Sequence, residues 1–266
     1  MPTVTTDDGV MLQYECSGGE ERGGDDRPTI AFISDVGFGP WVGGWQAPGL
    51  SGPYRTLVYG VRGTDGSGES EPYNIDRFAA DLDAVLSAAG RRRVHLVGAG
   101  VGGMVALRYA REYGRARSLT LFGVAATGNR IDKAALSALH PSNPEELENS
   151  LSVGFTDEFL AETGLTEQIT AWRRDEDATG SALSGHKSAA LEFEAGPLYE
   201  LTIPALVCHG VDDPVVSLDA GEELAADLPR GRFEPVEGKR CCYIEHAAAV
   251  TDAIDGFVEG VEAAKR

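Results

Sequence analysis

Three glycines within six residues form the pattern in this sequence that most directly suggests chemistry. Gly98, Gly100 and Gly103 lie in the stretch VHLVGAGVGGMVALRYA, between an apolar run and a helical pattern. The spacing G-x-G-x-x-G is typical of a turn whose backbone N–H groups bind a dinucleotide pyrophosphate. That hypothesis also needs an acid after the next strand, where residues 123–126 read GVAA. The missing acid disfavours nucleotide binding and leaves a strand–turn–helix unit of another kind.

The elements that must position this turn can be read from the alternation of apolar runs and helical patterns. Apolar runs typical of buried parallel strands lie at residues 29–34, 55–59, 94–97, 119–122 and 205–208. Helical patterns lie at residues 76–89, 101–113, 220–227 and 244–264. Residues 3–6 and 10–15, joined at Asp8-Gly9, predict an antiparallel hairpin, and residues 20–27 predict a polar loop.

The strand pattern disappears from about residue 128 to residue 201, where helical segments and Gly or Pro breaks replace it. We therefore predict an α/β fold with a mostly parallel sheet of about eight strands. Its core is predicted at residues 1–127 and 202–266, and a helical cap is predicted at residues 128–201.

Five motifs stand in one order along the chain, and together they resemble the α/β-hydrolase superfamily in its cap-bearing branch of esterases, dehalogenases and related lyases. The resemblance covers nearly the whole sequence, and it implies an α/β-hydrolase fold. It also implies that Gly100, Asp213 and Arg240 stand at the positions of nucleophile, acid and histidine. The motifs are DVGFG at 35–39, RGTDGSGES at 62–70, GAGVGG at 98–103, GVDDPV at 210–215 and GKRCCYIEH at 238–246.

The departures from that pattern remove the usual covalent chemistry. Gly100 has no side chain to attack a carbonyl, and Arg240 stays protonated and cannot act as a base. Asp35 and Val36 replace the histidine of the oxyanion loop, so only Asp213 remains of the triad. A degraded triad is therefore predicted, without a Ser-His-Asp mechanism.

The resemblance implies a polarised pocket that survives these changes. We expect the backbone N–H groups of Phe38 and Val101 to bind an oxyanion, and Arg240 to supply a cation oriented by Asp213. Structural alternatives stay open: a plain salt bridge for this pair, a core position for Tyr243, and a surface position for the cap histidines His140 and His186. The predicted catalytic residues are Arg240, Asp213, Asp35 and Tyr243, and the predicted substrate-binding residues are Gly37, Gly100, Trp172 and His186.

The altered positions keep space and charge, which favours a working enzyme over a filled-in pocket. We expect a non-hydrolytic enzyme of natural-product biosynthesis that catalyses an addition, cyclisation or carbon–carbon bond formation on an apolar, aromatic or polyketide-like intermediate. Two alternatives remain: a catalytically dead relative that binds a small molecule as a receptor or accessory protein, and a hydrolase with an unidentified nucleophile.

Composition limits the partners. The formal charge of −19 disfavours nucleic acid and anionic membrane surfaces. No apolar stretch approaches the ~20 residues of a membrane span, and no signal peptide is recognised, so a cytoplasmic protein is expected. The four cysteines form neither a disulfide framework nor a metal-ligand spacing. We expect a small-molecule substrate, no cofactor and no metal, and a homodimer stays open.

Overall fold

The apolar runs form the middle of one eight-stranded sheet in the computed structural model, which describes residues 1–17, 27–161 and 164–264. The order across the sheet is β1-β2-β4-β3-β5-β6-β7-β8. Most of the predicted polar loop, residues 20–26, lies outside the described residues. The strands are β1 (Thr3–Thr5), β2 (Met11–Ser17), β3 (Thr29–Ile33), β4 (Arg55–Tyr59), β5 (Val94–Ala99), β6 (Ala116–Phe122), β7 (Ala205–Gly210) and β8 (Gly231–Val236).

Strand pairing confirms the predicted mostly parallel sheet. β1 and β2 form the antiparallel hairpin, β2 pairs antiparallel with β4, and all later neighbours are parallel. β3, β5 and β7 are buried along their whole length, as expected for strands covered on both faces. The sequence pattern did not locate β8, because this edge strand is only partly buried and carries Pro235.

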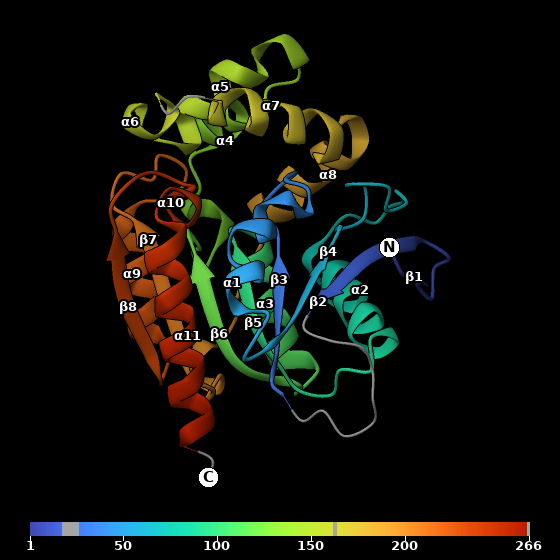
Figure 1. Ribbon diagram of the computed structural model, residues 1–266, viewed down its shortest axis with the longest axis vertical. Helices are drawn as coiled ribbons and strands as arrows, with labels where there is room; N and C mark the ends of the chain where they lie inside the picture. Colours follow the sequence, from blue (N-terminus) through green and yellow to red (C-terminus); the bar gives the residue numbers. More distant parts are fainter. Residues whose placement is uncertain (18–26, 162–163, 265–266) are drawn as a thin grey trace.

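Helices cover both faces of the sheet (Figure 1). α1 (Ala47–Leu50) packs against α11 (Ala247–Ala263) on one face, and α2 (Ile75–Ala88) packs against α3 (Val101–Glu112) on the other. α9 (Leu218–Asp227) contacts β7 and β8. The helix predicted at 244–264 is in fact two, α10 (Cys242–Glu245) and α11, because His246 between them has non-helical dihedral angles.

The region between β6 and β7 is helical and lies over the carboxyl ends of the parallel strands (Figure 1). These helices lie within residues 128–201, the segment for which the sequence predicts a helical cap. No described helix is long and apolar enough to cross a membrane. The cap helices are α4 (Lys133–Leu139), α5 (Leu147–Gly154), α6 (Asp157–Leu160), α7 (Leu165–Glu176) and α8 (Gly180–Leu191), and the short 3-10 helices are η1 (Pro40–Trp45), η2 (Gly128–Arg130), η3 (Pro144–Glu146) and η4 (Leu198–Glu200).

Candidate active site

Four predicted site residues meet at the carboxyl ends of the parallel strands. Asp35 follows β3, Gly100 joins β5 to α3, Asp213 follows β7, and Arg240 lies between β8 and α10. Carboxyl ends of parallel strands share one edge of the sheet, so loops that are far apart in sequence converge there. The structure thus brings together residues that sequence spacing alone only orders along the chain.

Arg240 is the centre of a buried ionic cluster. Its Nε donates to Asp35 Oδ2 at 2.8 Å, and its Nη1 donates to Asp213 Oδ2 at 3.0 Å and to the carbonyl of Gly123 at 2.7 Å. The side chains of Asp35, Asp213 and Arg240 are 1%, 0% and 4% exposed. Burial alone would lower the pKa of the Arg240 guanidinium, but the two carboxylates outweigh burial and raise that pKa above its ordinary value.

The Asp35 carboxylate fills the space beside Gly100. A Cβ built on Gly100 would lie 1.7 Å from Asp35 Oδ1 and 2.3 Å from Arg240 Nη2. Gly100 also has a φ of +44°, which L side chains rarely adopt. Asp35 Oδ1 accepts from the backbone N–H groups of Val36 at 2.6 Å and Val101 at 3.0 Å. The N–H of Val101 therefore points to the expected place, but an internal carboxylate occupies it.

The second expected oxyanion donor is engaged elsewhere in this structure. The N–H of Phe38 donates to the backbone carbonyl of Asp35 at 3.1 Å, which closes a turn. Gly37, with a φ of +69°, donates its N–H to His186 Nδ1 at 3.2 Å. The other nitrogen of His186 bonds the carbonyl of Arg62 at 2.9 Å. His186 of the cap thus forms hydrogen bonds to two loops of the core. Burial lowers the pKa of the His186 ring to about 4.

Two further predicted residues lie in packed surroundings. Trp172 stacks on Trp41 at 6.1 Å between ring centroids and meets Trp45 edge-on at 6.3 Å. Tyr243 is 5% exposed, packs on Phe122, and its hydroxyl has no hydrogen-bond partner among the described residues. Burial raises the pKa of the Tyr243 hydroxyl well above its ordinary value. Tyr243 therefore occupies a core position, which is the alternative that the sequence left open for it.

Two side chains of the cap close over this cluster. Sequence reasoning did not consider Leu183, and the surface position it left open for His140 and His186 is wrong, because both rings are buried. A Cβ on Gly37 would lie 2.7 Å from Leu183 Cδ1 of α8 and 3.2 Å from the ring of His140. His140 is 2% exposed, and its ring packs on Phe38 at 4.7 Å between centroids. Leu183 and His140 also line a cavity of about 430 Å³ within the cap. They therefore separate that cavity from the loop that carries Asp35.

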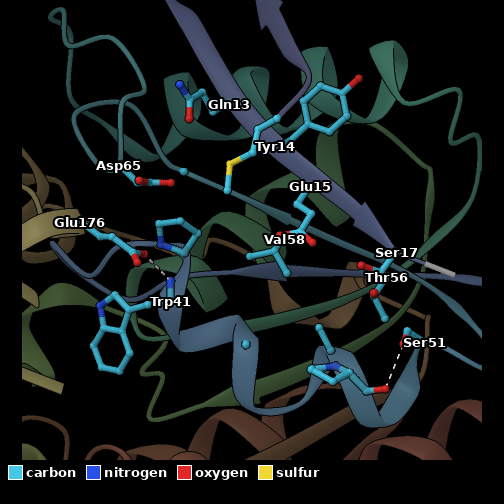
Figure 2. A pocket seen from close by; sticks show the side chains of 16 residues that line it. Gln13, Tyr14, Glu15, Ser17, Trp41, Ser51, Thr56, Val58, Asp65 and Glu176 are labelled. Carbon is cyan, nitrogen blue, oxygen red and sulfur yellow. Dashed lines mark hydrogen bonds between the residues drawn. The ribbon is translucent and has the colours of Figure 1, made fainter. Parts of the chain in front are cut away.

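A second cavity, of about 370 Å³, is lined by residues of β2, β4, η1 and α1 (Figure 2). The carboxylates of Asp65 and Glu176 lie near each other at one end of it, with Trp41 beside them. Burial, and then repulsion from Asp65, raise the pKa of Glu176 to about 7, although Glu176 accepts from the N–H of Trp41 at 2.9 Å. None of Asp35, Asp213 and Arg240 lines this second cavity, so the cavity is separate from the ionic cluster.

Comparison with known proteins decides the family. The profile of the alpha/beta hydrolase family matches residues 34–253. The chain belongs to the alpha/beta hydrolase family. 3-Oxoadipate enol-lactonase 1 of Acinetobacter baylyi is 24% identical in sequence, and the match covers 97% of this chain and 97% of the enol-lactonase. A non-heme chloroperoxidase of Kitasatospora aureofaciens is 27% identical in sequence, and the match covers 90% of this chain and 91% of the chloroperoxidase. The crystal structure of the enol-lactonase from Burkholderia xenovorans LB400 superposes with a TM-score of 0.82 at 21% identity, over 97% of this chain and 100% of that one.

These relatives correct the expected reaction. Enol-lactonases and other matching proteins are named for hydrolysis, and none of these names describes carbon–carbon bond formation or cyclisation. The expectation of a non-hydrolytic enzyme of natural-product biosynthesis is therefore wrong. That expectation assumed that a protein without a nucleophilic side chain cannot hydrolyse its substrate. Water itself can attack a carbonyl where a base is present. Family membership and the named relatives support an enzyme of hydrolytic type.

Proposed function

We propose that this alpha/beta hydrolase cleaves an ester or lactone by direct attack of water, without a covalent intermediate. In this proposal Gly100 stands at the nucleophile position and Arg240 at the histidine position, so the triad is degraded. Glycine supplies no nucleophile, and arginine supplies no base. The Asp35 carboxylate occupies the space beside Gly100 instead. The reaction thus needs a different group to activate water.

The observation that carries the proposal is the position of Asp35 Oδ1, 1.7 Å from where a side chain on Gly100 would begin. A carboxylate offers about four acceptor positions. The N–H groups of Val36 and Val101 use both acceptor positions of Oδ1, and Arg240 Nε uses one of Oδ2, so the position left for a water proton is on Oδ2. Asp35 is therefore placed to act as the general base.

Arg240 offers the complementary donor. Its Nη2 lies beside Gly100 and makes no hydrogen bond within the described part of the chain, whereas its Nε and Nη1 hold the two aspartates. As water oxygen bonds to the substrate carbonyl carbon, Asp35 takes one water proton and Nη2 donates to the oxyanion. Collapse of the tetrahedral intermediate breaks the carbon–oxygen bond to the leaving alcohol, and Asp35 returns the proton to it. Every proton and electron pair is accounted for by substrate, water and this pair.

Substrate reaches the cluster only if the cap side chains over Gly37 move. Leu183 and His140 close that face, and the cluster is almost fully buried without substrate. The chain thus favours small substrates that enter from the cap cavity beside these two residues. A closed resting site also excludes bulk water, which strengthens the interactions of the oxyanion with Arg240.

The test is turnover of simple aliphatic and aryl lactones by the purified chain, with Asp35→Asn as the variant. We expect kcat to fall about a hundredfold or more in Asp35→Asn, in the range known for loss of a general base. Asp76→Asn changes a carboxylate that is 71% exposed and is the matched control. Thermal unfolding of both variants shows whether the fold is kept.

Two further measurements separate mechanisms. A fluorophosphonate should not label the protein, and a single turnover in ¹⁸O-water should place the label in the acid product and leave the peptide containing Asp35 unlabelled. Fluorophosphonate labelling, or ¹⁸O in Asp35, would show that the reaction passes through a covalent intermediate and would contradict direct attack of water. Absence of turnover across the lactones would mean that the cluster is structural, as in a ligand-binding relative.

A further inference from the structure

The cap cavity of about 430 Å³ combines positive charge with an apolar wall. Arg173 and Arg174 of α7 and Lys187 of α8 line it, and so do Leu147 and Leu183. Arg174 is exposed and makes no ion pair or hydrogen bond among the described residues. Lys187 is half-buried, and its Nζ donates to the carbonyl of His140 at 2.8 Å. These cations line the cavity although the chain has 42 acidic residues and a net charge of −19.

Acidic side chains do not neutralise this cavity. Asp177 is the only acid that lines it within residues 1–17, 27–161 and 164–264, and the hydrogen bonds of Asp177 are to other residues of the protein. Asp177 Oδ2 accepts from Arg173 Nε at 2.9 Å, and Oδ1 accepts from the N–H of Gly39 at 3.0 Å and from Trp41 Nε1 at 2.9 Å. Within the described part of the chain, neither Arg174 nor Lys187 therefore pairs with an acid.

The N-terminus of α8 adds to the positive potential. Residues 178–180, 183 and 184 line the cavity, so this twelve-residue helix begins at its wall. The N-cap residue Thr179 makes no side-chain cap hydrogen bond, and the first turn contains no acid. Uncapped N–H groups and the helix dipole favour an anion at such a position.

A buried donor without an acceptor lies in the same wall. His140 lines the cavity at 2% exposure, and its Nε2 has no hydrogen-bond partner among the described residues. Arg173 Nη2 lies 3.2 Å from Nδ1 and can only donate. The neutral ring must then carry its proton on Nε2, which leaves an N–H unsatisfied. Such an unsatisfied N–H is costly in a buried position.

We infer that this cavity binds the anionic end of a small organic acid, with Arg174, Lys187 and the N-terminus of α8 as the donors. This inference rests on the proposed function, since it names the substrate as a lactone or ester that carries a carboxylate. The apolar side chains of Leu147 and Leu183 accommodate the carbon chain. When Leu183 and His140 move aside, the opposite end of the molecule reaches Gly37 and Asp35.

The test is calorimetric titration of the whole chain with hexanoate, and with hexanamide as its neutral analogue. We expect hexanoate to bind the unmodified protein about tenfold or more tightly than hexanamide. Arg174→Gln and Lys187→Gln should each weaken hexanoate binding by about tenfold and leave hexanamide binding unchanged. Lys133→Gln removes the same charge from an exposed position on α4 that does not line the cavity, and should change neither.

A second variant tests the helix N-terminus without removing a cation. Thr179→Asp supplies the missing cap, so thermal stability should rise while hexanoate affinity falls. Equal binding of hexanoate and hexanamide, or equal loss in Lys133→Gln and Arg174→Gln, would overturn the inference. Hexanoate binding without lactone turnover would count against the proposed function alone. Lactone turnover without selective hexanoate binding would count against this inference alone.

Discussion

At the scale of single residues, Gly100 and Asp35 depend on each other. The positive φ of Gly100 suits glycine, and the missing side chain makes room for the Asp35 carboxylate. Asp35 in turn holds Arg240, which holds Asp213. Removing one member of a buried ion cluster leaves the others as uncompensated charges, at a cost of about 3–5 kcal/mol. A single substitution therefore cannot restore a serine nucleophile here.

We predict that Gly100→Ser destabilises the fold more than backbone strain alone explains. Gly114→Ser is the control, because Gly114 has a φ of +61° and a Cβ there would meet nothing within 4 Å. The control should lose about 1–2 kcal/mol through strain, and Gly100→Ser at least about 2 kcal/mol more through collision with Asp35. Denaturant unfolding measures both. Equal losses in the two variants would show that Asp35 moves aside freely.

At the scale of elements, the start of α8 and the end of α7 hold the loop after β3. The N–H of Ala178 donates to the carbonyl of Gly37 at 2.7 Å, and Asp177 accepts from Gly39. His186 of α8 bonds Gly37 and the Arg62 carbonyl at once, and its ring packs on Phe78 at 5.0 Å. The loop that carries Asp35 therefore takes its shape from the cap as well as from the sheet.

The attachment through His186 should make stability depend on pH. The pKa of His186 is about 4 in the fold and 6.5 in the unfolded chain, because burial opposes the charged ring more than the hydrogen bond to the Arg62 carbonyl favours it. Below pH 6.5 the unfolded chain binds a proton that the folded chain does not, so stability falls as pH falls toward 4. Between pH 7.5 and 5 this linkage amounts to about 2 kcal/mol.

The measurement is denaturant unfolding of the unmodified chain and of His186→Gln across that pH range. The variant should be less stable at pH 7.5 and should lose about 2 kcal/mol less on acidification. His246→Gln changes an exposed histidine outside these contacts and is the control. If His186→Gln keeps the full pH dependence, the titrating group lies elsewhere.

At the scale of the whole molecule, negative charge dominates. The net charge of −19 destabilises the compact state by self-repulsion, while the cap cavity holds a local excess of cations. The long-range field repels an anion from most of the surface, and a local excess of cations offsets that repulsion inside the cap cavity.

We predict that sodium chloride stabilises this protein by screening. The thermal midpoint should rise by a few degrees, mostly below about 0.2 M, because the Debye length has already fallen to about 8 Å at 0.15 M. Potassium chloride should give the same curve, since screening depends on ionic strength and not on the ion. A midpoint that stays flat below 0.2 M would show that self-repulsion is already balanced by local ion pairs.

The sequence by itself determined the fold class, most strands and the helical insertion, because buried strands and amphipathic helices leave their periodicity in the chain. It also placed Gly100, Asp213 and Arg240 through ordered motifs. It did not predict that the Asp35 carboxylate fills the space beside Gly100, that the N–H of Phe38 donates within a turn, or that α8 begins at the wall of the cap cavity. Only the tertiary structure decided these, because each depends on distances between loops that converge from separate strands and helices. Spacing along a chain fixes the order of such groups and leaves their mutual distances open.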